Sequence, residues 1–188
     1  MESLLGIFSA FGLSASAGLN AYIPLLVVAL MARFTDLITL SEPWNALTSW
    51  WIIGLLIILS IVEFLVDKFP AINHINDIII GSFIRPTAGA IAFAASANVI
   101  TEVQPVLALA LGLLVSGSVH AVKSTTIRPA VTAATAGTGN VPVSVTEDVT
   151  SGTLSVLSVA VPIAGMVILL TIASLVIWRF FLRKPRSK

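Results

Sequence analysis

The sequence predicts an all-α, polytopic transmembrane helical bundle with about five or six membrane passes. Of its 188 residues, 57% are hydrophobic and only 10% are charged, whereas soluble domains carry about 25% charged residues. The mean hydropathy is +1.03, and apolar runs near the roughly 20 residues that span a bilayer recur along the chain. We expect one transmembrane domain over residues 1–182 and a basic tail over residues 183–188.

The first apolar run extends from Leu4 to Phe34. No Lys or Arg precedes it, so we interpret it as part of the mature chain rather than as a cleaved signal peptide. The run is longer than one pass needs. It forms either one tilted helix or a helix interrupted between Gly12 and Pro24, where small residues and a proline permit a break. We favour the broken or kinked form.

The second span is expected from about Ser49 to Val66. The tryptophans before and at its start suit an interfacial aromatic belt; they are Trp44, Trp50 and Trp51. Residues 71–82, which include His74 and Asp77, form a semi-polar connector. We expect a short helix there, either at the surface or partly buried.

Two further spans are expected from Phe83 to about Ile100 and from Val106 to Val122. Pro86 suits a helix start, where its missing N–H has no cost. Residues 127–135 are too short to cross alone and suggest a re-entrant or interfacial helix. Residues 137–151 suggest a loop. The last span is expected over residues 154–182, with Pro162 and Gly165 as kink sites.

A weak internal repeat aligns residues 12–21 with residues 112–121, with identical residues at the Gly, the Leu, a Ser and the final Ala. Asn20 and His120 occupy equivalent positions. If the copies are three passes apart along the chain, the repeat is inverted, and inverted repeats often place a binding site at their interface. Chance similarity between two stretches rich in small residues is the alternative.

The basic residues are concentrated at the C-terminus. Five of the ten lie there: Arg179, Arg183, Lys184, Arg186 and Lys188. The positive-inside rule places this tail in the cytoplasm, where it would meet anionic lipid headgroups. Five passes would leave the N-terminus outside, and six would bring both ends inside.

Ionisable residues within spans are functional candidates because charge is costly there. Glu63 lies inside the second span, and Asp67 shares its helix face four residues later. Arg85 and Arg128 each precede a Pro at an expected helix start. They either neutralise Glu63, Asp67 or Asp77, or form a clamp for a phosphate or carboxylate group. We favour the ion pair.

Asn20, His120 and Lys123 complete the set of candidate substrate-binding or ion-binding residues. His120 either shuttles protons or is a hydrogen-bonded packing residue. The chain has no Cys, and its two His residues match no metal motif. We therefore expect no cofactor and no metal. We also find no catalytic motif and no feature typical of nucleic-acid binding, so we do not expect an enzyme.

Four motifs together are similar to a known family. They are the Gly12–Pro24 segment, Glu63-x-x-x-Asp67-Lys68-x-Pro70, Ile84-Arg85-Pro86-x-x-Gly89 and His120-x-x-Lys123. The combination resembles a bacterial membrane family catalogued as a domain of unknown function, family 4126, over most of the chain to about Pro142. The resemblance implies a polytopic fold in the inner (plasma) membrane and no particular activity.

Two functions remain open. The first is a transporter or permeation protein, acting as a homo-oligomer, for an anionic small solute or lipid headgroup. In it the basic residues meet the anion, and Glu63 and Asp67 bind a coupling proton or cation. The second is a structural or accessory membrane protein whose charges only join its helices.

Overall fold

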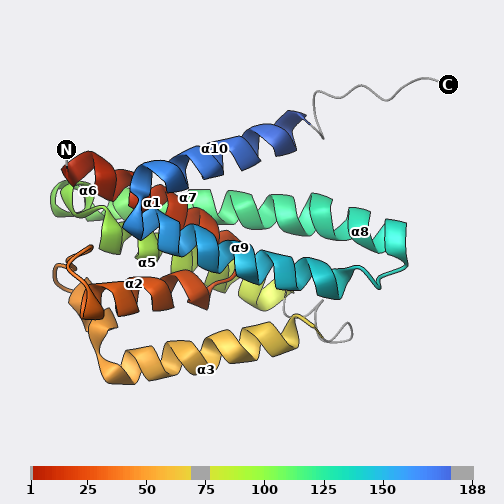
Figure 1. Cartoon of the computed structure of the whole chain (residues 1–188), viewed down its shortest axis with the longest axis horizontal. Coiled ribbons are helices and arrows are strands. Elements are labelled where there is room, and N and C mark those ends of the chain that lie inside the picture. Colours follow the sequence, from red (N-terminus) through yellow and green to blue (C-terminus); the bar gives the residue numbers. More distant parts are fainter. Residues whose placement is uncertain (1, 69–76, 179–188) are drawn as a thin grey trace.

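The computed structural model describes residues 2–68 and 77–178, and this part of the chain is helical with no β-strand (Figure 1). The α-helices are α1 (Glu2–Leu19), α2 (Tyr22–Phe34), α3 (Trp50–Val66), α5 (Arg85–Ser96), α6 (Asn98–Val103), α7 (Pro105–Val122), α8 (Arg128–Thr135), α9 (Asn140–Ala160) and α10 (Pro162–Ile177). A 3₁₀ turn, η1 (Trp44–Thr48), and two π-helical segments, η2 (Asp77–Ile84) and η3 (Lys123–Ile127), connect them. The all-α prediction is confirmed for these residues.

The first apolar run is broken at Asn20, as expected. The Asn20 side-chain oxygen accepts the backbone N–H groups of Tyr22 at 3.1 Å and Ile23 at 3.0 Å, which satisfies two free donors at the start of α2. Pro24 lies in the first turn of α2, where its missing N–H is harmless. Helix α2 then runs back, so that residues 36–39 lie beside the beginning of α1 (Figure 1).

Helix α3 has nearly the bounds expected for the second span. The expected third span is divided, because the helix breaks at Ala97 between α5 and α6. The fourth is longer than expected, because α7 continues through η3 into α8. The expected separate helix at residues 127–135 is therefore the end of this continuous segment. Among the described helices, only Pro105–Thr135, with 31 residues, is both long and apolar enough to cross a bilayer.

The loop expected over residues 137–151 is wrong, because most of it belongs to α9. The polar composition suggested a loop, but Ser and Thr hydroxyls bond to carbonyls one turn earlier in the helix, as from Thr146 to Pro142 and from Ser155 to Ser151. These small residues also allow close packing. A Cβ added at Gly12 of α1 would collide with Ser158 of α9.

The expected last span is not continuous. Helix α9 ends at Ala160, and Pro162 begins α10 after a break at Val161. Proline is suited to the first position of a helix but not to its interior, so the expected kink at Pro162 is a complete interruption. The tail over residues 183–188, the connector's His74 and the cytoplasmic placement of the C-terminus lie outside the described residues or are not tested by them.

The two copies of the weak repeat run in the same direction. The Ser14 hydroxyl donates to the Gly112 carbonyl at 2.7 Å, and Lys123 Nζ donates to the Leu19 carbonyl at 3.0 Å. Because residue numbers increase together along both contacts, α1 and α7 are parallel neighbours. The expectation of an inverted repeat is wrong, since the return of α2 along α1 adds one reversal of the chain between the copies.

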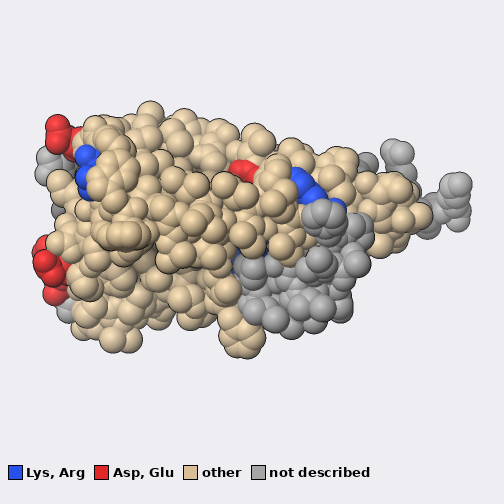
Figure 2. Space-filling model, turned by 90° about the horizontal axis from the view of Figure 1, so that it is seen from below, with Lys and Arg blue, Asp and Glu red and all other residues tan. Residues whose placement is uncertain are grey.

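The bundle has small and polar side chains inside and large apolar side chains outside. Its fully buried residues include many Ala and Ser, whereas Leu, Ile, Val and Trp of α3, α7 and α10 are exposed. Acidic and basic side chains occupy only a few places on the face in Figure 2, and an uncharged surface lies between them. Close helix contact follows from the small residues, as in the pairing of Gly89 with Gly112 between α5 and α7.

Candidate functional site

Glu63 is on α3, near the end of that helix. Its fully buried side chain reaches the start of α2. Its carboxylate accepts the Ala21 backbone N–H at 3.0 Å. The break at Asn20 exposes this N–H, and the positive end of the α2 dipole favours an anion here. The break between α1 and α2 therefore provides a hydrogen-bond donor for the Glu63 carboxylate of α3.

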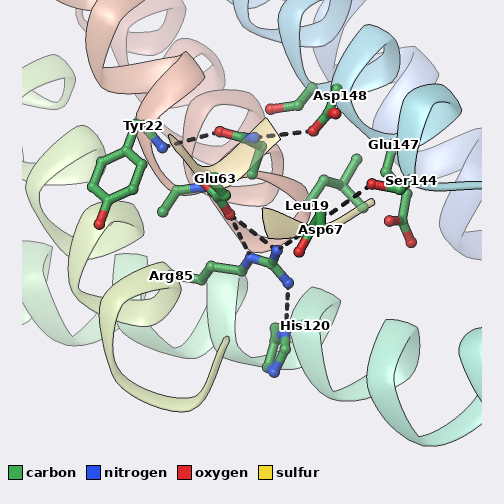
Figure 3. Close-up of polar contacts among 12 residues, drawn as sticks. Leu19, Tyr22, Glu63, Asp67, Arg85, His120, Ser144, Glu147 and Asp148 are labelled. Atoms are coloured by element: carbon green, nitrogen blue, oxygen red, sulfur yellow. Dashed lines mark hydrogen bonds and ion pairs between the residues drawn. The ribbon is translucent and has the colours of Figure 1, made fainter. Parts of the chain in front are cut away.

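Arg85, at the start of α5, joins three of the predicted residues. Its Nε and Nη2 atoms donate to Glu63 Oε1 at 3.1 and 3.0 Å, and Nη2 lies 3.4 Å from Asp67 Oδ2. Its Nη1 atom lies 3.3 Å from His120 Nδ1 (Figure 3). The ion pairs of Arg85 with Glu63 and Asp67 are among those that the sequence predicted.

A second arginine, Arg128, also pairs with Asp67 and with one further acid. Arg128 Nη2 lies 2.6 Å from Glu147 Oε2 and 3.6 Å from Asp67 Oδ2. Lys123 Nζ lies 3.0 Å from Glu147 Oε2 and 3.9 Å from Asp67 Oδ2. Ser144 of α9 adds a hydroxyl 3.4 Å from the same Asp67 oxygen. Asp67 therefore connects the two arginines.

The Asn20 side chain links a fourth acid, Asp148, to the break between α1 and α2. Its Nδ2 atom donates to Asp148 Oδ1 at 3.0 Å while its oxygen caps α2. Asp148 also pairs with Lys68 at 3.1 Å. Lys68 is largely buried, with 17% of its side chain exposed.

These residues form one cluster, which we call the charge network. Among the described residues it contains four acidic and four basic side chains, whose formal charges cancel; they are Glu63, Asp67, Glu147, Asp148, Lys68, Arg85, Lys123 and Arg128. Each charge has a partner of opposite sign, which is the condition for burying charges at acceptable cost. The two arginines are not a vacant anion clamp.

The structure brings all seven predicted residues together. Glu63, Asp67, Arg85, Lys123 and Arg128 belong to the charge network, and Asn20 and His120 contact it. Their role in binding a solute or an ion stays a prediction. The side chain of Asp77, the other expected partner, lies outside the described residues.

Sequence reasoning missed the roles of Ser144, Glu147 and Asp148 and the ion pair between Lys68 and Asp148. The signal was present, because Ser144, Asp148, Ser151 and Ser155 recur at helical spacing. We overlooked it because residues 137–151 were interpreted as a loop. Among the described residues, no group of three or more His, Cys, Asp or Glu is arranged to hold a metal ion.

The fold and the network define a class of protein: a helical bundle with an apolar exterior, interrupted helices and a buried, charge-balanced ionic core. Residues 7–181 match the sequence model of the family described as a domain of unknown function (DUF4126), and the chain belongs to this family. The match continues past Pro142, where the resemblance was expected to end. No curated protein and no solved structure was found to match the chain.

Proposed function

We propose that this chain is a multi-pass protein of the bacterial inner (plasma) membrane. The exposed Leu, Ile, Val and Trp side chains support a lipid environment. Besides Pro105–Thr135, the described residues contain four apolar helices of 10–17 residues, including Trp50–Val66, which are shorter than an ordinary span. In this arrangement the basic tail faces the cytoplasm and contacts anionic headgroups, and copies of the chain associate as a homo-oligomer.

Within that membrane the protein is proposed to be a transporter or permeation protein for a small anionic solute or lipid headgroup. The observation that carries this proposal is the charge network at the break between α1 and α2. Buried charge in a membrane protein is costly and commonly marks an ion or solute pathway. Interrupted helices are typical of transporter binding sites, and α1–α2, α5–α6 and α9–α10 are all interrupted.

The balance of charges suggests how such a protein couples transport to protons. The described charges of the network cancel, so an anion that enters it adds a negative charge without a matching positive one among these residues. A proton that enters with the anion and neutralises Glu63 or Asp67 restores the balance. The same proton releases Arg85 from its carboxylate, so that the guanidinium can hold the anion with forked geometry. Proton and anion would therefore move together.

The test is a flux assay in proteoliposomes at two values of the proton gradient. The probes are inorganic phosphate, succinate and a fluorescent phosphatidylglycerol whose headgroup crossing is measured by quenching. We expect an inward proton gradient to accelerate uptake of one probe in the wild type. Glu63→Gln and Arg85→Ala should reduce this flux at least tenfold.

Controls separate transport from folding. Glu102→Gln removes an exposed acid outside the network and should keep the wild-type rate. Arg85→Lys keeps the charge and tests whether the forked geometry matters. Wild-type flux in both Glu63→Gln and Arg85→Ala, in protein that remains monodisperse, would overturn this site.

The second candidate is a structural or accessory membrane protein without transport activity. The observation in its favour is that each described member of the charge network already has a partner, so that the charges serve only to join α3, α5, η3, α8 and α9. In this case the exchange Lys68→Asp with Asp148→Lys should restore the stability lost in either single variant. The wild type should then transport none of the three probes.

A further inference from the structure

We propose that a separate cavity at the other end of α1 binds a small organic ammonium ion. The cavity has a volume of about 570 Å³ and lies between the start of α1, residues 36–39 and the breaks after α5 and α9. None of its lining residues belongs to the charge network. Its size falls in the range typical of small-molecule sites.

Two residues that line the cavity each have a buried side-chain oxygen without a hydrogen-bond partner among the described residues. These oxygens are Ser96 Oγ and Asn98 Oδ1. Ser96 is only 5% exposed, and a buried polar group without a partner costs about 1–3 kcal/mol. Such groups are explained when a ligand or water completes them. A third lining residue, Ser9, donates its hydroxyl to the Ser158 carbonyl at 2.6 Å, so this hydroxyl can only accept a further hydrogen bond.

The chemistry of the wall favours a ligand that donates hydrogen bonds and carries positive charge. Asn98 uses its Nδ2 to donate to the Thr39 carbonyl at 3.0 Å, so its free oxygen is an acceptor. Asp36 is exposed and lines the same cavity, which places a carboxylate at its mouth. Among the described lining residues Asp36 is the only charged one. An ammonium group, which has donors and no acceptor, complements this set.

The remaining wall selects an ammonium ion with an apolar body. Leu5, Ile38 and Val159 line the cavity together with Pro162. A hydrated metal cation would leave these side chains unmatched, whereas a compact hydrocarbon skeleton would cover them. The predicted ligand therefore has one ammonium group and a small aliphatic or alicyclic part.

The position of the cavity supports binding rather than a packing defect. Irregular backbone at membrane depth is tolerated where it lines a cavity, and the breaks at Ala97 and Val161 are both adjacent to lining residues. Figure 1 shows the start of α1, α6 and the α9–α10 junction at one end of the molecule, away from α8. Ser9 and Asn20 are eleven residues apart on α1, or about 16 Å along a helix.

The experiment measures binding by calorimetry to the purified full-length protein in detergent. The probes are cyclohexylammonium, cyclohexanol and cyclohexanecarboxylate, which share one ring and differ in charge. We expect saturable binding of the ammonium ion at least tenfold tighter than that of the alcohol, and no binding of the carboxylate. Equal binding of all three, or of none, would overturn the inference.

Two substitutions locate the site. Asp36→Asn should reduce the preference for the ammonium ion over the alcohol to less than threefold, whereas Glu102→Gln, an exposed acid outside the cavity, should not change it. Ser96→Ala should weaken ammonium binding roughly threefold to tenfold, the equivalent of one hydrogen bond. Without ligand it should melt at the same or a higher temperature, because a buried hydroxyl without a partner is removed. A lower melting temperature with unchanged binding would contradict the assignment of Ser96.

This inference does not depend on the proposed transport activity. Glu63→Gln should abolish flux and leave ammonium binding intact, whereas Asp36→Asn should alter the binding preference in a protein whose charge network is unchanged. Binding without any flux in the wild type would refute the transport proposal alone. Flux without ammonium binding would refute the cavity assignment alone.

Discussion

Glu63→Gln is the most direct test of the charge network as a structural unit. The substitution keeps the size of the side chain and removes its charge. In the wild type the carboxylate accepts the Ala21 N–H and two donors of Arg85 between 3.0 and 3.1 Å. The amide oxygen of Gln can accept only part of this set, and its NH₂ group would face donors.

The expected loss in the free energy of unfolding depends on the contacts that Arg85 keeps in the variant. Removing one partner of a buried ion pair costs about 3–5 kcal/mol. Arg85 keeps Asp67 at 3.4 Å, and the introduced amide still accepts neutral hydrogen bonds, so we expect the lower end of the range, about 3 kcal/mol. The free energy of unfolding in mixed detergent, from an SDS titration followed by circular dichroism, measures this loss.

A double-mutant cycle shows whether the loss belongs to the Glu63–Arg85 pair. Arg85→Met alone leaves two carboxylates without this partner, whereas Glu63→Gln with Arg85→Met removes one charge of each sign. We expect the double variant to be more stable than the sum of the single losses by about 1–3 kcal/mol. Glu102→Gln serves as the control and should lie within about 0.5 kcal/mol of the wild type. A loss below about 0.5 kcal/mol for Glu63→Gln, with additive losses in the double variant, would refute the ion-paired assignment.

Three further substitutions test the packing, again by the free energy of unfolding. Gly112→Ala should cost about 1–3 kcal/mol because its Cβ would overlap the Gly89 carbonyl and Phe93. Gly54→Ala is the control and should be neutral or stabilising, because the space around Gly54 is open. Equal effects of the two substitutions would contradict the α5–α7 contact. Ala136→Gly should stabilise by about 1 kcal/mol because Ala136 has φ +50°, and a loss would contradict that conformation. Ser16→Ala should also stabilise, by about 1 kcal/mol, because its hydroxyl is buried without a partner among the described residues; destabilisation would indicate a partner.

Local sequence signals predicted some helix ends and missed others. Pro86 correctly marked a helix start, whereas Pro162 was expected only as a kink site and begins a separate helix. Both effects are local, because proline restricts the backbone of its own residue and the residue before it. The break between Gly12 and Pro24 was expected for the same local reason. The interruption at Ala97 was not expected, since no proline or glycine occurs there to mark it.

The sequence predicted which residues would meet at the candidate site better than it predicted which residues they pair with. Ionisable residues in an apolar sequence are few, so Glu63, Arg85 and Arg128 stood out without any structure. Glu147 and Asp148 did not, because their surroundings are rich in Gly, Thr and Ser and lack the apolar periodicity of a helix. The helix forms because those small residues pack closely against α1.

Residue types alone were sufficient to predict the class of fold, the apolar exterior and the identity of most buried charges. These properties follow from composition and from the cost of placing charge among apolar residues, which depend little on arrangement. The packed structure was needed to show that α1 and α7 are parallel, that α9 supplies two acids and that four acids pair with four bases among the described residues. The physical reason is that an ion pair requires two side chains within about 4 Å, and helix packing between distant segments sets that distance.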